Sequence, residues 1–213
     1  NFEDSERYTA SDIQVLGAME AVRLRPGMYI GSTDQRGLHH LVYEIVDNGV
    51  DEFMAGHCSR IEIHLSEDGS LRIEDDGRGI PVDIHPATGV SAVQTVMTTL
   101  HAGGKFGGKA YTVSGGLHGV GASVVNALSS SFKVDVYLDG RVHSQEFQRG
   151  EPQGDLASEE VHGSNGHKTG TVISFIPDVD IFGELQYEFS TLSQRFKEMA
   201  YLNKGLEIRF KSE

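Results

Sequence analysis

Residues 38–56 have the sequence LHHLVYEIVDNGVDEFMAG, which is the clearest helical pattern in the chain. Apolar residues recur there at spacings of three and four, which places them on one side of an α-helix. They are Leu38, Leu41, Val42, Ile45, Val46, Phe53 and Met54. Gly56 stands where a glycine commonly caps the C-terminal end of a helix. The segment therefore predicts a long helix that packs one apolar face against a core.

A polar ridge runs along the same helix. His40, Glu44, Asn48 and Glu52 recur at every fourth residue, so they project along one side. A solvated helix face would have the same spacing. Two features favour a functional ridge instead: it contains no Lys or Arg, and Gly49 weakens a helix by about 1 kcal/mol relative to Ala. Side-chain chemistry or a close approach would explain these residues, and the spacing alone leaves both explanations open.

The remaining elements predict an α/β fold. We expect strands at 61–65, 71–75, 133–138, 142–147, 171–176 and 206–210. We expect helices at 91–100, 120–128 and 190–202, and a short helix from near Ile13 that ends at Arg25-Pro26-Gly27. Strand pairs and helices mix without strict alternation, so the pattern predicts a two-layer α/β sandwich with a mixed, mostly antiparallel sheet. Residues 149–168 are polar and predict a mobile insertion.

Composition limits the functions open to the chain. Its 213 residues carry a net charge of −13, whereas a surface that grips DNA phosphates is usually basic. We therefore expect no direct DNA contact from this stretch. Cys58 is the single cysteine, so no disulfide framework can form within the chain, which fits a reducing compartment. The sequence contains no signal peptide or membrane-spanning stretch, and we expect a cytoplasmic protein.

Two glycine-rich regions have the residues of a nucleotide site. DDGRGIP at 75–81 ends a predicted strand with two carboxylates; this is ordinary turn chemistry, but a carboxylate there could accept a hydrogen bond from a base amine. HAGGKFGG at 101–108 and SGGLHGVG at 114–121 precede a predicted helix, and backbone N–H groups at such a helix start bind anions. No Gly-Lys-Ser/Thr follows, so this is not the P-loop. A plain linker remains the alternative for this stretch.

Taken together, these segments closely resemble the B subunits of bacterial type II DNA topoisomerases, which belong to the GHKL ATPases with Hsp90, histidine kinases and MutL proteins. The matching stretches are RPGMYIG (25–31), GLHHLVYEIVDNGVDE (37–52), DDGRGIP (75–81), LHAGGKF (100–106), SGGLHGVG (114–121) and KTGT (168–171). The resemblance implies the GHKL (Bergerat) fold, with ATP and Mg²⁺ as cofactors.

The resemblance also implies roles for individual residues. Glu44 would be the general base that activates the attacking water, and His40 would orient or tune it. Asn48 would bind the Mg²⁺, while Asp75, helped by Thr171, would read the adenine amine. The other residues expected around the nucleotide are Glu52, Arg78, Gly79, Ile80, Pro81, Gly103, Lys105, Gly116, Leu117, His118, Gly119, Val120, Gly121 and Tyr8, the last reaching from a partner's arm.

The same resemblance implies an N-terminal arm at 1–12 and an ATP-binding domain at 13–213, within a longer protein. The arm would exchange in a homodimer, and the full enzyme would include a topoisomerase A subunit and DNA. In the family a later domain supplies a lysine to the γ-phosphate, so we expect weak ATP hydrolysis by this chain alone. ATP-site inhibitors are expected ligands. Leu138, however, stands where many members carry an arginine that contacts aminocoumarins, so tight aminocoumarin binding is not expected.

Several interpretations stay open from the sequence. The B subunits of DNA gyrase and topoisomerase IV differ mainly in regions absent from this chain. A MutL-like or Hsp90-like ATPase would share the fold and the ATP chemistry without DNA strand passage. A nucleotide-gated dimerisation module without catalysis would keep the pocket, and a plain acidic α/β domain would bind no nucleotide.

Overall fold

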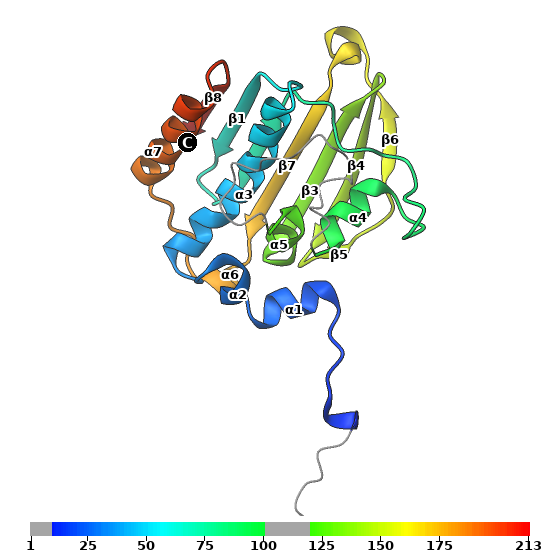
Figure 1. The fold of residues 1–213 in the computed structure, drawn as a ribbon, viewed down its shortest axis with the longest axis vertical. Helices are drawn as coiled ribbons and strands as arrows, with labels where there is room; N and C mark the ends of the chain where they lie inside the picture. Colours follow the sequence, from blue (N-terminus) through cyan, green and yellow to red (C-terminus); the bar gives the residue numbers. More distant parts are fainter. Residues whose placement is uncertain (1–9, 101–119) are drawn as a thin grey trace, which may run out of the picture.

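The computed structural model describes residues 10–100 and 120–213, in which a layer of helices covers one face of a sheet (Figure 1). The helices are α1 (Ala18–Leu24), α2 (Gly27–Ile30), α3 (Gln35–Met54), α4 (Ala92–Thr98), α5 (Ala122–Ala127), α6 (Val179–Phe182) and α7 (Phe189–Leu202), with 3-10 turns η1 (Ala10–Asp12) and η3 (Gly163–His167). The strands are β1 (Arg60–Leu65), β2 (Leu71–Asp75), β3 (Ser129–Leu138), β4 (Arg141–Gln148), β5 (Glu151–Pro152), β6 (Ala157–Glu160), β7 (Gly170–Pro177) and β8 (Glu207–Ser212).

The strands within the described residues form one eight-stranded mixed sheet. Its order is β5-β4-β3-β7-β2-β1-β8, and β6 also pairs with β4. The pair β1–β8 is parallel, whereas the other strand pairs are antiparallel. The predicted two-layer fold with a mixed, mostly antiparallel sheet is therefore confirmed.

The core lies between the sheet and the helix layer. In β1, Ile61, Ile63 and Leu65 are buried while the residues between them are more exposed, because alternate side chains of a strand point to opposite faces. The largest fully buried side chains include Phe132, Phe147 and Phe175 from neighbouring strands. Burial of these apolar faces supplies most of the free energy that holds the two layers together.

Helix α3 crosses this core and approaches the sheet closely. Its N-cap, Asp34, accepts a hydrogen bond from the Arg36 N–H at 2.9 Å, which explains why the helix begins three residues before the predicted start. A Cβ atom on Gly49 would lie only 2.7 Å from Cδ1 of Ile61 and 3.5 Å from Cβ of Asp75. Gly49 thus lets the middle of α3 lie against the ends of β1 and β2.

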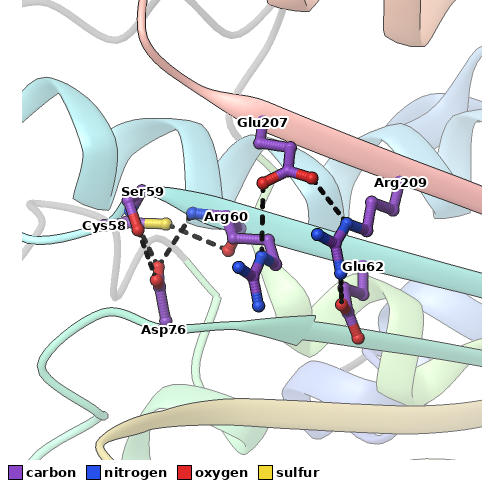
Figure 2. Close-up of polar contacts among 7 residues, drawn as sticks. All are labelled: Cys58, Ser59, Arg60, Glu62, Asp76, Glu207 and Arg209. Atoms are coloured by element: carbon purple, nitrogen blue, oxygen red, sulfur yellow. Dashed lines mark hydrogen bonds and ion pairs between the residues drawn. The ribbon is translucent and has the colours of Figure 1, made fainter.

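Ion pairs join the side chains of β1 and β8 at the edge of the sheet where these two strands run parallel (Figure 2). Glu207 of β8 contacts Arg60 of β1 at 3.4 Å and Arg209 at 2.5 Å, and Arg209 reaches Glu62 at 3.1 Å. These side chains are exposed, so each pair contributes only about 0–1 kcal/mol. They nonetheless join β1 to β8 across the one parallel pairing of the described sheet.

Two local predictions were wrong. The short helix begins at Ala18 and not near Ile13; residues 13–17 are not helical, and their exposed apolar side chains, such as Val15, have no core to pack against. For 149–168 we expected a polar, mobile insertion and no strand, but the stretch contains β5, β6 and η3. All four β6 residues are exposed, as expected of an edge strand whose polar composition hides its pairing with β4.

The other boundaries agree with the predictions to within a few residues. Gly56 follows the end of α3 at φ +86°, in the left-handed conformation expected of a C-terminal glycine. Met54, predicted on the apolar side, is instead 45% exposed. None of the helices in the described ranges is both long enough and apolar enough to cross a lipid bilayer.

Candidate nucleotide site

Glu44 is the most enclosed member of the α3 ridge, at 4% exposure. Its Oε1 accepts a hydrogen bond of 3.0 Å from the backbone N–H of Gly121, and its Oε2 lies 3.3 Å from Nε2 of His40. The His40 contact is not aligned for a hydrogen bond. A carboxylate held this way on a buried helix side is not part of a solvated face. The structure therefore favours the functional explanation of the ridge at this position.

Further along α3, Glu52 organises the turn that follows β2. Its carboxylate accepts hydrogen bonds from Nη2 of Arg78 at 2.7 Å, from Nε at 3.2 Å and from the Arg78 backbone N–H at 3.1 Å. A two-pronged arginine–carboxylate contact of this kind fixes geometry as well as charge. Glu52 thus orients the loop that carries the predicted adenine-side residues.

Asn48 lies between Glu44 and Glu52 on the same side of α3. Its side chain is partly exposed and makes no hydrogen bond to another residue of the described ranges. An amide in this position can present its oxygen to a ligand. Unlike the Glu44 and Glu52 carboxylates, it accepts no hydrogen bond from a described neighbour.

Asp75 ends β2 opposite Thr171 of β7, in direct register. Its Oδ1 accepts a hydrogen bond of 2.9 Å from the backbone N–H of Gly77. Burial raises the pKa of Asp75 to about 6, and the charge of Glu52 adds to that rise. A carboxyl group that is little hydrated in the free protein gains more from a new hydrogen-bond donor than an exposed one would.

Glycines bring the backbone close at this end of the sheet. A Cβ on Gly170, at φ +139°, would lie 2.0 Å from the carbonyl oxygen of Asp75. A Cβ on Gly77 would lie 2.8 Å from Oε2 of Glu52 and 2.9 Å from Oδ1 of Asp75. Side chains at these positions would therefore displace the acidic groups of the site.

The structure brings the two halves of the predicted site together. Helix α3 supplies His40, Glu44, Asn48 and Glu52; the end of β2 and its turn supply Asp75, Arg78, Gly79, Ile80 and Pro81; Thr171 comes from β7, and Val120 and Gly121 lead into α5. Thr171 is buried, Ile80 is packed against the core, and Pro81 is exposed. The predicted residues Tyr8, Gly103, Lys105, Gly116, Leu117, His118 and Gly119 lie outside the described residues.

Three residues at this end of the sheet were not singled out from the sequence. Gly77 and Gly170 were not singled out, although both lie inside the quoted motifs DDGRGIP and KTGT, where a glycine can signal a close approach. Lys168 of the same KTGT motif was also missed; it forms an ion pair with Glu74 and lies 4.3 Å from the centre of the Tyr137 ring. A separate surface hollow, lined by Gln35, Leu65 and Tyr187 among others, contains none of the predicted nucleotide residues.

Residues 33–181 match the family model described as "Histidine kinase-, DNA gyrase B-, and HSP90-like ATPase". The chain belongs to this ATPase family. The match includes α3, β2 and the start of β7, which are the elements that carry the described site. The domain is accordingly an ATP-binding ATPase domain, and the plain acidic α/β domain is excluded.

Curated relatives are similar over almost the whole chain. The DNA gyrase B subunit of Synechocystis sp. is 58% identical over 204 residues, covering 95% of this chain and 19% of the relative. The gyrase B subunit of Halalkalibacterium halodurans is 58% identical over 207 residues, covering 97% and 32%. That of Haloferax volcanii is 55% identical over 211 residues, covering 99% and 33%. The chain thus spans no more than about one third of the length of these relatives.

Proposed function

We propose that this ATPase domain binds Mg-ATP and hydrolyses it to drive strand passage by a type II DNA topoisomerase of the gyrase kind. The observation that carries the proposal is the joint placement of Glu44 and Asp75 on facing elements of a GHKL-type ATPase domain. Identity of 55–58% to DNA gyrase B subunits favours gyrase over a topoisomerase IV or MutL-like function.

At the adenine end, Asp75 accepts a hydrogen bond from the exocyclic amine of the base, with Thr171 beside it. Support comes from the register of the two residues and from the poor hydration of the Asp75 carboxyl. The adenine ring is bordered by the turn that Glu52 holds through Arg78. Its residues are Arg78, Gly79, Ile80 and Pro81.

At the phosphate end, Glu44 accepts a proton from the attacking water. The water oxygen bonds to the γ-phosphorus while the bond from that phosphorus to the oxygen of ADP breaks, so ADP leaves. His40, one helical turn earlier and 3.3 Å away, orients or tunes the carboxylate. Backbone N–H groups from Gly116 to Gly121, together with Gly103 and Lys105, cradle the phosphates. Support comes from the Gly121 N–H, which donates to Glu44 and so places Gly121 beside the proposed general base.

The residues present fit a magnesium ion that is held mainly by phosphate oxygens. No group of three or more His, Cys, Asp or Glu side chains suited to a metal occurs in residues 10–100 and 120–213. Mg²⁺ in nucleotide sites commonly takes one or two protein oxygens and fills its remaining positions with phosphate oxygens and water. The Asn48 side-chain oxygen would be that protein ligand. Mg²⁺ would neutralise phosphate charge and leave Glu44 available as the base.

The proposed partners follow from the same family. A second copy of the protein would bind through the arm at 1–12, with Tyr8 entering the neighbour's site. The A subunit and DNA would join in the full-length enzyme, in the cytoplasm where its DNA substrate lies. ATP-site inhibitors would compete with the nucleotide. With the A subunit, the full-length protein is expected to supercoil relaxed plasmid; decatenation without supercoiling would point to topoisomerase IV.

Calorimetric titration with a non-hydrolysable Mg-ATP analogue tests the nucleotide site. The parent chain should show saturable binding. Asp75→Asn should weaken it by about 100-fold (about 2–3 kcal/mol), because the carboxylate only accepts hydrogen bonds whereas the amide NH₂ donates them and opposes the adenine amine. Asp68→Asn is the matched control, since it makes the same charge change in the exposed β1–β2 turn. Equal binding by the parent and Asp75→Asn would place the base elsewhere, and no binding by the parent would contradict the proposal.

A further inference from the structure

A buried ion-pair cluster lies at the C-terminal end of α5, the helix whose N-cap contacts Glu44. Asp178, which precedes α6, is fully buried, and its Oδ2 accepts from Nη2 of Arg23 at 2.9 Å and from Nε of Arg149 at 2.9 Å. Its Oδ1 accepts the Asp180 N–H at 3.0 Å. Burial opposes ionisation of Asp178, yet these hydrogen bonds hold its pKa below the ordinary value. The carboxylate is therefore charged and fully engaged.

The two arginines of the cluster make different further contacts. Arg23, on α1, also donates from Nη1 to the carbonyl oxygen of Ala127, the last residue of α5, at 2.9 Å. The Arg149 side chain instead reaches Asp180 at 3.6 Å, and the Arg149 backbone N–H donates to the carbonyl oxygen of Ser129 at 2.9 Å. Arg149 holds φ +49°, a left-handed conformation that is rare for its residue type. Of the two arginine side chains, Arg23 is the one that donates to a residue of α5 among the described hydrogen bonds. The Asp178 backbone N–H also donates to the carbonyl oxygen of Leu128, the C-cap of α5, at 2.9 Å, and neither arginine substitution removes that bond.

Helix α5 runs from the Arg23–Ala127 contact to Glu44, the candidate general base. All its residues from Ala122 to Ala127 are buried, and it packs against α1, α3 and α4. Its N-cap is Gly121, whose N–H donates to Oε1 of Glu44 at 3.0 Å. Close-packed interiors have low compressibility and transmit strain, so we expect a displacement at one end of this short helix to reach the other end. A change at Ala127 is thus felt at Gly121.

We propose that Arg23 is a positioning residue for Glu44, because it holds α5 by its last carbonyl and thereby sets where the Gly121 N–H meets the Glu44 carboxylate. The inference rests on the proposed role of Glu44 as general base. It makes α1, the helix that follows the N-terminal segment, part of the support of the catalytic group. The planar guanidinium suits this task since it can bridge a carbonyl and a carboxylate at once.

The test compares Arg23→Gln with Arg149→Gln. Each variant removes one arginine from Asp178, so each loses a buried ion-pair partner, but only the first loses the contact to α5. The probe is the amide resonance of Gly121 in ¹H–¹⁵N spectra of the ¹⁵N-labelled chain. Glu44→Ala gives the reference shift for loss of the Gly121–Glu44 hydrogen bond. Thermal unfolding of each variant checks that it is folded.

Arg23→Gln is expected to move the Gly121 resonance at least about halfway to the Glu44→Ala position, whereas Arg149→Gln leaves it nearly unchanged. In the full-length protein, Arg23→Gln should lower kcat for ATP hydrolysis by about tenfold or more, with KM within about threefold of the parent. Arg23→Lys keeps the charge beside Asp178 without the two-pronged reach, and it should shift Gly121 as well. It serves as the readout if Arg23→Gln does not fold.

An unmoved Gly121 resonance in the Arg23 variants would overturn the inference, and so would an equal shift in Arg149→Gln, which would mean that Arg23 acts through stability alone. Failure of the proposed function has a different signature. Hydrolysis that survives Glu44→Gln would remove Glu44 as the base, whatever the Gly121 resonance does in the Arg23 variants.

Discussion

Asp75 and Asp76 are adjacent in the chain, yet their carboxyl groups lie in opposite electrostatic surroundings. The Asp75 carboxyl faces Gly77 and α3, and burial raises its pKa to about 6. Burial also opposes ionisation of Asp76, but hydrogen bonds from Ser59 and Arg60 outweigh that effect and lower its pKa to about 2 (Figure 2). Successive side chains at a strand end point to opposite faces, so the Asp75 carboxyl lies on the α3 side whereas the Asp76 carboxyl braces β1.

Replacing Asp75 by Asn should stabilise the free chain at neutral pH. The folded pKa of Asp75 lies above its ordinary value of 3.8, so the stability it contributes is complete below pH 3.8 and is lost as the pH rises through about 6. Asn does not titrate and avoids that loss. Urea unfolding should therefore find Asp75→Asn more stable by about 1–3 kcal/mol at pH 7, with the gain disappearing near pH 4.

The same variant is expected to lose nucleotide binding, so the native aspartate would be kept for function at a cost in stability. Asp68→Asn is again the control and should show no comparable pH-dependent gain. A difference between Asp75→Asn and the parent that stays constant from pH 4 to 7 would contradict the assigned surroundings of Asp75.

Replacing Asp76 by Ala should have the opposite pH dependence. The folded pKa lies below the ordinary value, so the stability from Asp76 is present above pH 3.8 and is lost as the pH falls through about 2. Because the residue is exposed, we expect a loss of only about 1–2 kcal/mol at pH 7. Urea unfolding from pH 2 to 7 measures it. A loss that is as large at pH 2 as at pH 7 would show that the charged hydrogen bonds are not its source.

Gly170→Ala should be strongly destabilising. Its Cβ would lie 2.0 Å from the Asp75 carbonyl oxygen, so β2 and β7 must separate at the candidate adenine site, at a cost of about 3 kcal/mol or more. Gly154→Ala is a matched control with φ +156° and no atom within 4 Å, and should cost about 1 kcal/mol. Thermal or urea unfolding compares the two. Equal losses would mean that backbone conformation alone, and not the close approach to Asp75, governs Gly170.

Glu44→Gln should separate binding from hydrolysis. The glutamine keeps the size and one acceptor oxygen for the Gly121 N–H, but it cannot take a proton from water. In the full-length protein, we expect ATP hydrolysis to fall by about 10²–10⁴-fold, with the affinity for a non-hydrolysable analogue within about threefold of the parent. Steady-state hydrolysis and calorimetry measure the two effects. His40→Ala should reduce hydrolysis less. Rapid turnover by Glu44→Gln would assign the base to another residue.

Local patterns were enough to predict the fold and to name candidate site residues. The spacing of His40, Glu44, Asn48 and Glu52 reflects the period of one helix, and the alternation in 61–65 and 71–75 reflects the period of a strand; both lie within a single segment. The motifs added the family, which the matching model confirmed. The roles assigned to individual site residues, the domain limits, the magnesium ion and the dimer arm stay predictions.

Tertiary structure alone decided the rest, because it depends on contacts between residues far apart in the chain. The residue pattern described Asp75 and Asp76 only as two carboxylates at a strand end, and the family resemblance alone singled out Asp75. The facing elements, α3 for Asp75 and the start of β1 for Asp76, made them chemically different. No strand was predicted at 149–168 because an edge strand needs no buried side chains, and only the pairing with β4 defines β6. Arg23 and Asp178 lie far apart in the chain, so no periodic pattern in the sequence links them. They meet only when α1 and the start of α6 pack at the C-terminal end of α5.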